Sequence, residues 1–168
     1  MPLIQRVLDQ LPYEDIDQVV MVSGYDAPKI ASVSKNYQIE IAHNPNYQEG
    51  MSTSIATGAK ALRSRAPSGI LICLGDMPFL QKADYQSIIN AFHDHDVSVV
   101  IPTWQSKPGH PVLFSQKHLK GLMELDTGDS GAKKLILNED PAKILRLEMD
   151  SAHCLRDMDT PDDFTPNM

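Results

Sequence analysis

The sequence predicts a three-layer α/β domain with a mostly parallel sheet. Two observations lead to this fold class: short apolar runs that stop near glycine or proline, and amphipathic segments that lie between them. Apolar runs such as residues 69–74 and 97–101 are typical of strands that are buried on both faces. A chain that alternates such strands with helices folds into a sheet covered by helices on both sides. We therefore expect residues 1–168 to form one domain of this class.

The first expected element is a helix over residues 3–11. Its apolar residues fall on one helical face, and Pro2 suits the first turn. Along the rest of the chain, apolar runs predict strands at residues 18–24, 39–42, 69–74, 97–101, 111–114, 144–147 and 154–158. The segments between them predict helices at residues 27–35, 50–65, 85–93, 116–123 and 129–138.

The composition is that of an ordinary globular chain, with 42% hydrophobic and 22% charged residues. Its 15 basic and 22 acidic residues give a net charge of -7, and no Lys/Arg cluster offers a surface for nucleic acid. No apolar stretch is long enough to span a membrane, and no secretory leader is recognisable. Cys73 and Cys154 form neither a disulfide framework nor a zinc motif. We expect a cytoplasmic protein.

Asp76 is the sharpest local candidate for chemistry. It follows the expected strand at residues 69–74, at the position where open α/β sheets gather ligands. Gly75 permits a ligand to approach the backbone closely, and Pro78 prevents the strand from continuing. One carboxylate at this place suits Mg²⁺, which usually takes one or two protein carboxylates together with phosphates and water. The alternative is that Asp76 only caps the following turn.

A second group of carboxylates lies near the end of the chain. Asp157 and Asp159 are separated by one residue at the end of an expected strand, so they share one face. Either carboxylate could join Asp76 on a single metal ion, because two carboxylates match the share of ligands that Mg²⁺ takes from proteins.

His110 lies between Gly109 and Pro111, directly before an expected strand. A histidine held in a rigid loop at the edge of a sheet can bind an anionic or polar acceptor, or transfer a proton near neutral pH. The alternative is a turn whose histidine is solvated.

Six motifs, in order, resemble the molybdenum-cofactor cytidylyltransferases and the wider MobA-like nucleotidyltransferases. They are Val22-Ser23-Gly24-Tyr25, residues 43–55, Gly75-Asp76-Met77-Pro78, Gly109-His110-Pro111, Gly128-Asp129-Ser130-Gly131-Ala132 and residues 157–163. The resemblance covers essentially the whole chain and implies a Rossmann-like fold of the nucleotide-diphosphate-sugar transferase (GT-A-like) type. The Gly-His-Pro and Gly-Met-Ser-x-Ser segments favour the cytidylyltransferase branch over the guanylyltransferase branch.

The resemblance implies a nucleotidyltransferase that moves CMP from CTP, in preference to GMP from GTP, onto molybdopterin and releases pyrophosphate. Asp76 and Asp159 would hold Mg²⁺ and, with His110, form the catalytic group. The nucleotide would contact Gly50, Met51, Ser52 and Ser54 as well as Asp76. Gly109, His110 and Pro111 would face the pterin. A molybdoenzyme maturation partner is also implied.

The resemblance is incomplete at the start of the chain. Family members begin with a strand and a Leu-x-x-Gly-x-Ser-x-Arg-Met-Gly-x-x-Lys loop around the triphosphate, and this sequence starts after that point. We therefore expect the fold without its first strand, which leaves a gap or an unpaired edge, and weaker triphosphate binding. One alternative is a catalytically inactive member that binds a ligand or a partner. A sugar-nucleotide enzyme is another, since such enzymes also use carboxylates on a metal.

Overall fold

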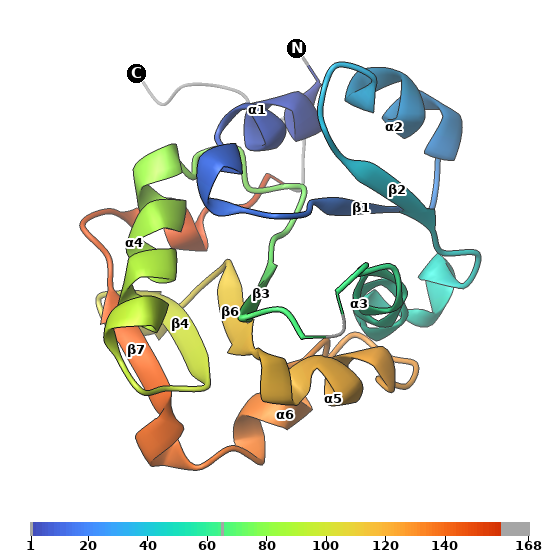
Figure 1. Ribbon diagram of the computed structural model, residues 1–168. Coiled ribbons are helices and arrows are strands. Elements are labelled where there is room, and N and C mark those ends of the chain that lie inside the picture. The colour runs from blue at the N-terminus through green and yellow to red at the C-terminus, as the bar shows by residue number, and fades with distance from the viewer. Residues whose placement is uncertain (1, 65, 159–168) are drawn as a thin grey trace.

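The computed structural model describes residues 2–64 and 66–158 (Figure 1). Its α-helices are α1 (Leu3–Asp9), α2 (Ala27–Ser34), α3 (Met51–Lys60), α4 (Lys82–Asp94), α5 (Leu119–Met123) and α6 (Lys133–Leu137). Its strands are β1 (Val20–Ser23), β2 (Glu40–His43), β3 (Gly69–Ile72), β4 (Val99–Trp104), β5 (Lys107–Pro108), β6 (Val112–Ser115) and β7 (Ile144–Glu148). Short 3-10 helices are η1 (Tyr13–Asp15), η2 (Tyr47–Glu49), η3 (Gln116–His118), η4 (Pro141–Lys143) and η5 (Ala152–Leu155).

The described strands form two sheets. β1 and β2 pair in parallel, with Val20 opposite Glu40. The larger sheet has the order β3-β6-β4-β5, and β7 pairs in parallel with β4. Among the described strands β1 pairs with β2 alone and does not join β3.

The larger sheet is mixed rather than mostly parallel, because β6 runs antiparallel to both β3 and β4. The physical reason is the short connection between β4 and β6, residues 105–111, which also contains β5. A parallel pair needs a crossover of about a dozen residues or more. β3 and β4, which α4 connects, run in the same direction. The α/β fold class is confirmed, with this difference in strand pairing.

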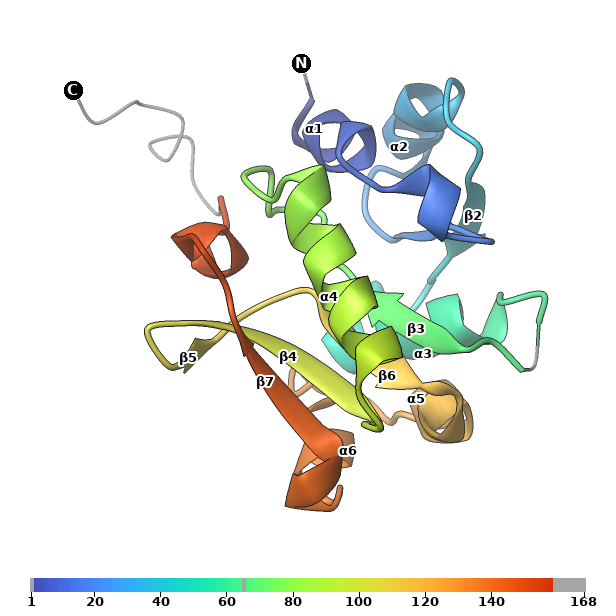
Figure 2. The same cartoon turned by 60° about the vertical axis from the view of Figure 1, so that its left-hand side comes forward.

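Helices cover both faces of the larger sheet, which gives the three expected layers (Figures 1 and 2). Successive side chains of β4 and β6 alternate between two cores, as the pleat requires. The core beneath α4 contains Tyr85, Ile88, Val100 and Leu113. The core on the opposite face, beside α3 and α5, contains Ala59, Val99, Val112, Phe114 and Leu122.

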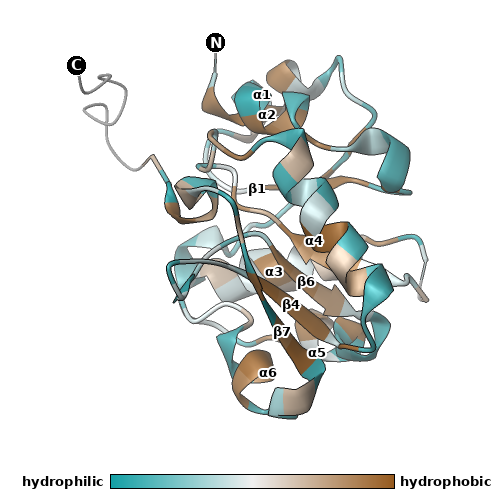
Figure 3. Ribbon diagram, turned by 90° about the vertical axis from the view of Figure 1, so that its left-hand side faces the viewer, coloured by the Kyte–Doolittle hydropathy of each residue, from teal (hydrophilic) through white to brown (hydrophobic). Residues whose placement is uncertain are grey.

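β4 is buried at every position except its last. Burial on both faces explains why its sequence is a continuous apolar run without alternation. Figure 3 shows the hydrophobic colour of β4 and β6. Each aliphatic or aromatic side chain buried in this way contributes roughly 1.5–3 kcal/mol, so the central strands are the main source of stability.

The helices α1 and α4 contribute to the same core. α1 follows Pro2 and buries Val7 and Leu8. α4 begins with a capping box, in which the side chains of Gln81 and Asp84 each accept a hydrogen bond from the other residue's backbone amide. α1 is therefore held by its buried face, and α4 begins at a defined cap.

Several expected elements have a different type or different bounds in the structure, and three of these differences are the largest. The strand expected at residues 154–158 is wrong: η5 includes Cys154 and Leu155, and residues 156–158 lie in no helix or strand. The Ser151 hydroxyl accepts a hydrogen bond from the His153 amide at the start of η5. The helix expected over residues 50–65 ends at Lys60. The helix expected over residues 129–138 is shortened to α6, because Gly131 has a φ of 54° and interrupts helical geometry.

Within the part of the chain that the structure describes, no helix is both long enough and apolar enough to cross a membrane. Both cysteines are free thiols. Burial raises the pKa of the Cys73 thiol to about 12 and also raises the pKa of Cys154. Neither residue is a reactive thiolate at neutral pH.

Candidate active site

Asp76 lies in the loop between β3 and α4, beyond the carboxyl end of β3. The buried side chains of Met77 and Leu80 anchor this loop, while Asp76 itself is half-buried. The cap of α4 is made by Gln81 and Asp84, so capping that helix is not the role of Asp76. The position suits a ligand contact.

The register of the larger sheet brings His110 to the same edge as Asp76. Val112 pairs with Ile72 in an antiparallel ladder, so the amino end of β6 lies beside the carboxyl end of β3. His110 precedes that end of β6, and Asp76 follows that end of β3. The negative charge of Asp76 acts on the imidazole of His110.

The loop that carries His110 is fixed to η5. The Gly109 amide donates to the Pro102 carbonyl at 2.8 Å, and the His110 amide donates to the Cys154 carbonyl at 2.9 Å. A β-carbon on Gly109 would overlap the carbonyl of Cys154, so this position requires glycine. Pro111 follows and is buried.

The imidazole of His110 is not a solvated turn group. Its Nδ1 atom is buried and has no hydrogen-bond partner among the described residues. Burial lowers the pKa of His110, and the charge of Asp76 opposes that shift only in part. The ring is therefore neutral at neutral pH and has one N–H to donate.

The chain returns to the loop of Asp76 at the end of the described residues. The Met158 amide donates to the Asp76 carbonyl at 2.9 Å, and the side chain of Met158 is buried. Asp157 is exposed. Asp159, the second expected metal ligand, lies outside the described residues.

The described residues contain no group of three or more His, Cys, Asp or Glu side chains that could hold a metal ion. A closed structural metal site of the zinc type, which needs four protein ligands, is therefore not formed by them. A site based on one or two carboxylates, completed by phosphate oxygens and water, is the arrangement that Mg²⁺ prefers. The half-buried carboxylate of Asp76 fits that second arrangement.

The expected nucleotide-binding segment, residues 50–54, forms the start of α3. Gly50 has a φ of 111°, and a β-carbon there would overlap the carbonyl of Gly128. The Gly128 amide donates to the Glu49 carbonyl at 2.7 Å, and the Ser52 amide donates to the Gly128 carbonyl at 3.0 Å. Residues 128–131 therefore lie against this helix start, beside the exposed side chain of Met51.

Ser52 and Ser54 have different surroundings. Ser52 is 2% exposed, and its hydroxyl donates to the Gly131 carbonyl at 3.4 Å. The hydroxyl of Ser54 accepts a hydrogen bond from Nδ2 of Asn44 at 3.0 Å, and Thr53 Oγ1 accepts another from the same nitrogen at 2.9 Å. Asn44 is itself buried. Asn44 holds the segment in place and was missed as an individual site residue, although it belongs to the motif at residues 43–55.

The placement of Asp76 and His110 at one edge of a three-layer α/β sheet is compatible with the nucleotidyltransferase class. The chain belongs to the MobA-like NTP transferase domain family, whose profile matches residues 1–143. The family and the Rossmann-like fold that the sequence predicted are thereby confirmed.

Relatives of known name agree with this assignment. Over 148 residues the chain is 26% identical to the molybdenum cofactor cytidylyltransferase of Escherichia coli, covering 88% of this chain and 72% of that protein. The manganese complex of Rv0371c from Mycobacterium tuberculosis superimposes with a TM-score of 0.77 at 23% identity, covering 98% of this chain and 84% of that one. The 4-diphosphocytidyl-2C-methyl-D-erythritol synthase of Anaerococcus prevotii gives 0.76 at 18% identity, with 97% and 82% covered.

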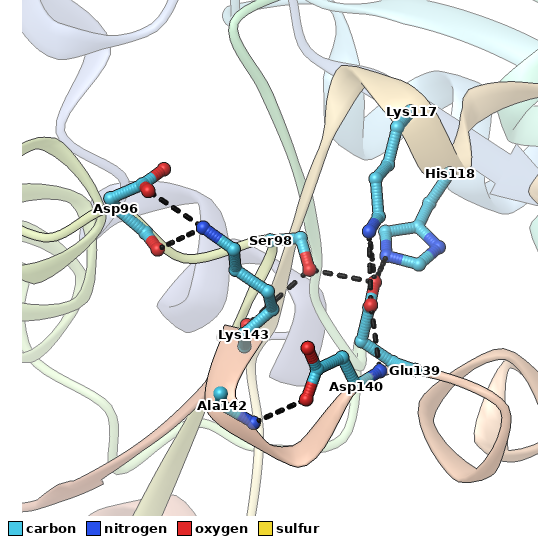
Figure 4. Close-up of polar contacts among 8 residues, drawn as sticks. All are labelled: Asp96, Ser98, Lys117, His118, Glu139, Asp140, Ala142 and Lys143. Atoms are coloured by element: carbon cyan, nitrogen blue, oxygen red, sulfur yellow. Dashed lines mark hydrogen bonds and ion pairs between the residues drawn. The ribbon is translucent and has the colours of Figure 1, made fainter.

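A separate polar cluster lies at the opposite edge of the larger sheet (Figure 4). Ser98 precedes the amino end of β4, which runs parallel to β3, so the cluster is remote from Asp76. The carboxylate of Glu139 accepts hydrogen bonds from Ser98 Oγ at 2.7 Å and from Lys117 Nζ at 2.9 Å. These contacts join the ends of several elements and support the fold.

Proposed function

We propose that this chain transfers CMP from CTP to the phosphate of a molybdopterin-type acceptor and releases pyrophosphate. The observation that carries the proposal is the hydrogen bond from the Met158 amide to the Asp76 carbonyl, at 2.9 Å. It brings the chain to the loop of Asp76 at the residue directly before Asp159 in the sequence. The 26% identity to a molybdenum cofactor cytidylyltransferase supports the choice of CTP and of the acceptor.

In this reaction an acceptor phosphate oxygen forms a bond to the α-phosphorus of CTP, and the bond from that phosphorus to pyrophosphate breaks. Asp76 and Asp159 would hold Mg²⁺, which when bound neutralises charge on the phosphates. A divalent metal fits the half-buried carboxylate of Asp76, and the complex of a protein with the same fold contains manganese. The protein's main tasks are positioning and charge compensation.

The nucleotide and the acceptor would occupy different segments. The backbone at Gly50, with Met51 and Ser54, would contact the base and ribose, while buried Ser52 holds residues 128–131 against them. On the acceptor side, the neutral imidazole of His110 would donate a hydrogen bond to the acceptor. Gly109 and Pro111 keep that loop against η5.

Calorimetric titration with CTP and GTP, in Mg²⁺, Mn²⁺ or chelator, tests the nucleotide and metal assignments. We expect metal-dependent binding of CTP that is tighter than binding of GTP. Asp76→Asn should weaken that binding by about tenfold or more, because the metal loses a charged ligand. Asp94→Asn, an exposed change on α4, should leave it unaltered and serves as the matched control.

Release of pyrophosphate from CTP in the presence of molybdopterin tests the reaction itself. Turnover that disappears in Asp76→Asn supports the proposal. Binding of CTP without turnover would refute it and favour a catalytically inactive, ligand-binding member of the family. A preference for GTP, no nucleotide binding, or turnover only with sugar phosphates would also refute it.

A further inference from the structure

The strands β4 and β5 are joined by a tight hairpin turn. Trp104 pairs with Lys107, so Gln105 and Ser106 form the turn. Their φ angles are 49° and 65°, both in the left-handed region. A two-residue turn with two positive φ angles is typical of type I′, which the pair Asn-Gly adopts most readily. Gln and Ser do not favour this backbone, so the turn depends on stabilising contacts from outside the hairpin.

The carboxylate of Glu148 supplies these contacts. Glu148 is the last residue of β7 and pairs with Thr103 of β4. Its Oε1 atom accepts a hydrogen bond from the Gln105 amide at 2.5 Å. Its Oε2 atom accepts one from Thr103 Oγ1 at 2.7 Å and one from the Ser106 amide at 3.4 Å. The bond from Thr103 is the main cause that lowers the pKa of Glu148, so the group is a carboxylate at neutral pH.

The backbone that carries Glu148 and the donor of Thr103 are both fixed. Thr103 is only 3% exposed. The Met149 amide donates to the Thr103 carbonyl at 2.8 Å, which extends the pairing of β7 with β4 beyond Glu148. The carboxylate therefore joins the mobile end of the hairpin to the buried central strand of the sheet.

The position of the turn determines the register of β5 and of the residues after it. β5 consists of Lys107–Pro108 alone, and both residues are exposed. Thr103 pairs with Pro108, and the Gly109 amide continues this ladder by donating to the Pro102 carbonyl at 2.8 Å. A slip of one residue would turn each following side chain to the other face. Such a short strand has few contacts of its own to prevent that slip.

His110 directly follows this ladder. Its amide donates to the Cys154 carbonyl at 2.9 Å, which holds the loop from the side of η5. The hairpin holds the same loop from the side of β4, through the pairing of Gly109 with Pro102. The direction of the imidazole therefore depends on two fixed points, and Glu148 stabilises one of them.

We propose that Glu148 is a positioning residue for His110: its carboxylate fixes the turn at residues 105–106 and thereby the place from which the imidazole meets the acceptor. The proposal rests on the proposed function, because that function gives His110 its contact with the acceptor. It adds to the candidate site a residue that lies outside all six family motifs.

Amide hydrogen exchange of the full chain, followed by NMR, measures this positioning without any substrate. In Glu148→Ala the amides of Gly109 and His110 should exchange about tenfold faster, because their hydrogen bonds open more often. Glu148→Gln keeps one acceptor oxygen and should give a smaller increase. The matched control is Glu139→Gln, which weakens the network at the opposite edge of the sheet and should leave these two amides unchanged.

A change in the sequence of the turn separates positioning from direct contact with a substrate. Gln105→Asn together with Ser106→Gly introduces the pair that adopts a type I′ turn without a carboxylate. In the Glu148→Ala background these two changes should restore slow exchange at Gly109 and His110. If they do not, or if Glu148→Ala speeds exchange at Gln105 alone, the carboxylate does not position the loop and the proposal is overturned.

Pyrophosphate release from CTP and molybdopterin, measured in the same variants, tests the consequence for the reaction. Glu148→Ala should raise the KM for the acceptor about fivefold to tenfold and leave the KM for CTP unchanged, and the two turn changes should reverse this effect. An unaltered acceptor KM, or a defect that the turn changes do not reverse, would overturn the proposal. Absence of turnover in the unmodified chain would refute the proposed function, whereas restored slow exchange at His110 would still support the positioning by Glu148.

Discussion

Removing the carboxylate of Glu139 should destabilise the protein far more than removing an ordinary surface carboxylate. Glu139 lies outside any helix or strand, yet its side chain is only 5% exposed. It accepts hydrogen bonds from Ser98 Oγ at 2.7 Å and from the Asp140 amide at 2.8 Å. Lys117 Nζ lies 2.7 Å and His118 Nε2 lies 2.8 Å from Oε2 of the same carboxylate (Figure 4).

The expected loss follows from these contacts. Hydrogen bonds to a charged acceptor contribute about 1.5–3 kcal/mol each, and the bonds from Ser98 and from the Asp140 amide are of this kind. The Lys117 side chain is 55% exposed. Its ion pair should therefore add only about 0.2–1 kcal/mol. Because neighbouring contributions do not add fully, we expect Glu139→Ala to cost about 2–4 kcal/mol. Glu139→Gln keeps an acceptor and should cost about 1–2 kcal/mol.

Urea unfolding at pH 7, followed by circular dichroism, measures this loss as a lower midpoint with an unchanged slope. The matched control is Glu124→Ala, since Glu124 is 65% exposed and lies 3.9 Å from Lys120. It should cost less than about 0.5 kcal/mol. If Glu139→Ala and Glu124→Ala have the same midpoint, the buried network does not stabilise the fold and the reasoning is refuted.

Three further predictions follow from the same structure. In the folded protein, hydrogen bonding from Lys117 lowers the pKa of Glu139 from 4.5 to about 2, so the stabilisation that this carboxylate provides is complete above pH 4.5 and is lost as the pH falls to about 2. The free energy of unfolding, measured at decreasing pH, should show this loss, and the loss should be absent in Glu139→Gln. Gly109→Ala should cost about 1–3 kcal/mol by overlap with Cys154, whereas Gly75→Ala, which meets only the flexible end of a side chain, should cost less in thermal unfolding. Asn44→Ala should cost about 2 kcal/mol in the same assay, because it removes buried hydrogen bonds at the start of α3.

Much of the secondary structure could be predicted because burial leaves a strong local pattern. The strands at residues 69–74, 97–101 and 111–114 were recognised from continuous apolar runs, and the structure buries β4 and β6 almost completely. The segment at residues 154–158 is less apolar, since it contains Arg156 and Asp157, and a side-chain cap from Ser151 and the bond between His110 and Cys154 give it a different backbone. Local hydrophobicity does not encode such distant partners.

The candidate site, too, could be predicted from the sequence only in part. Asp76 and His110 were selected because each stands beside an expected strand end, and sheet register alone brings them to one edge. His153 had no evident partner in the sequence, since Asp84 lies far away along the chain. The role of Asn44 was missed for a related reason: its importance comes from three hydrogen bonds to residues 46–54, which depend on the path of that loop.

The order of the motifs predicted the family, but it did not predict which distant segments lie against the glycines of those motifs. Gly50 makes room for the carbonyl of Gly128, and Gly109 makes room for the carbonyl of Cys154. A sequence shows that a side chain is absent but not which distant backbone fills the space. Because Gly50 and Gly128 are in contact, the motif at residues 128–132 is positioned by the same contact as the nucleotide segment, although no separate role was predicted for it. A side chain at Gly50 should therefore disturb both motifs, because it would overlap the carbonyl of Gly128.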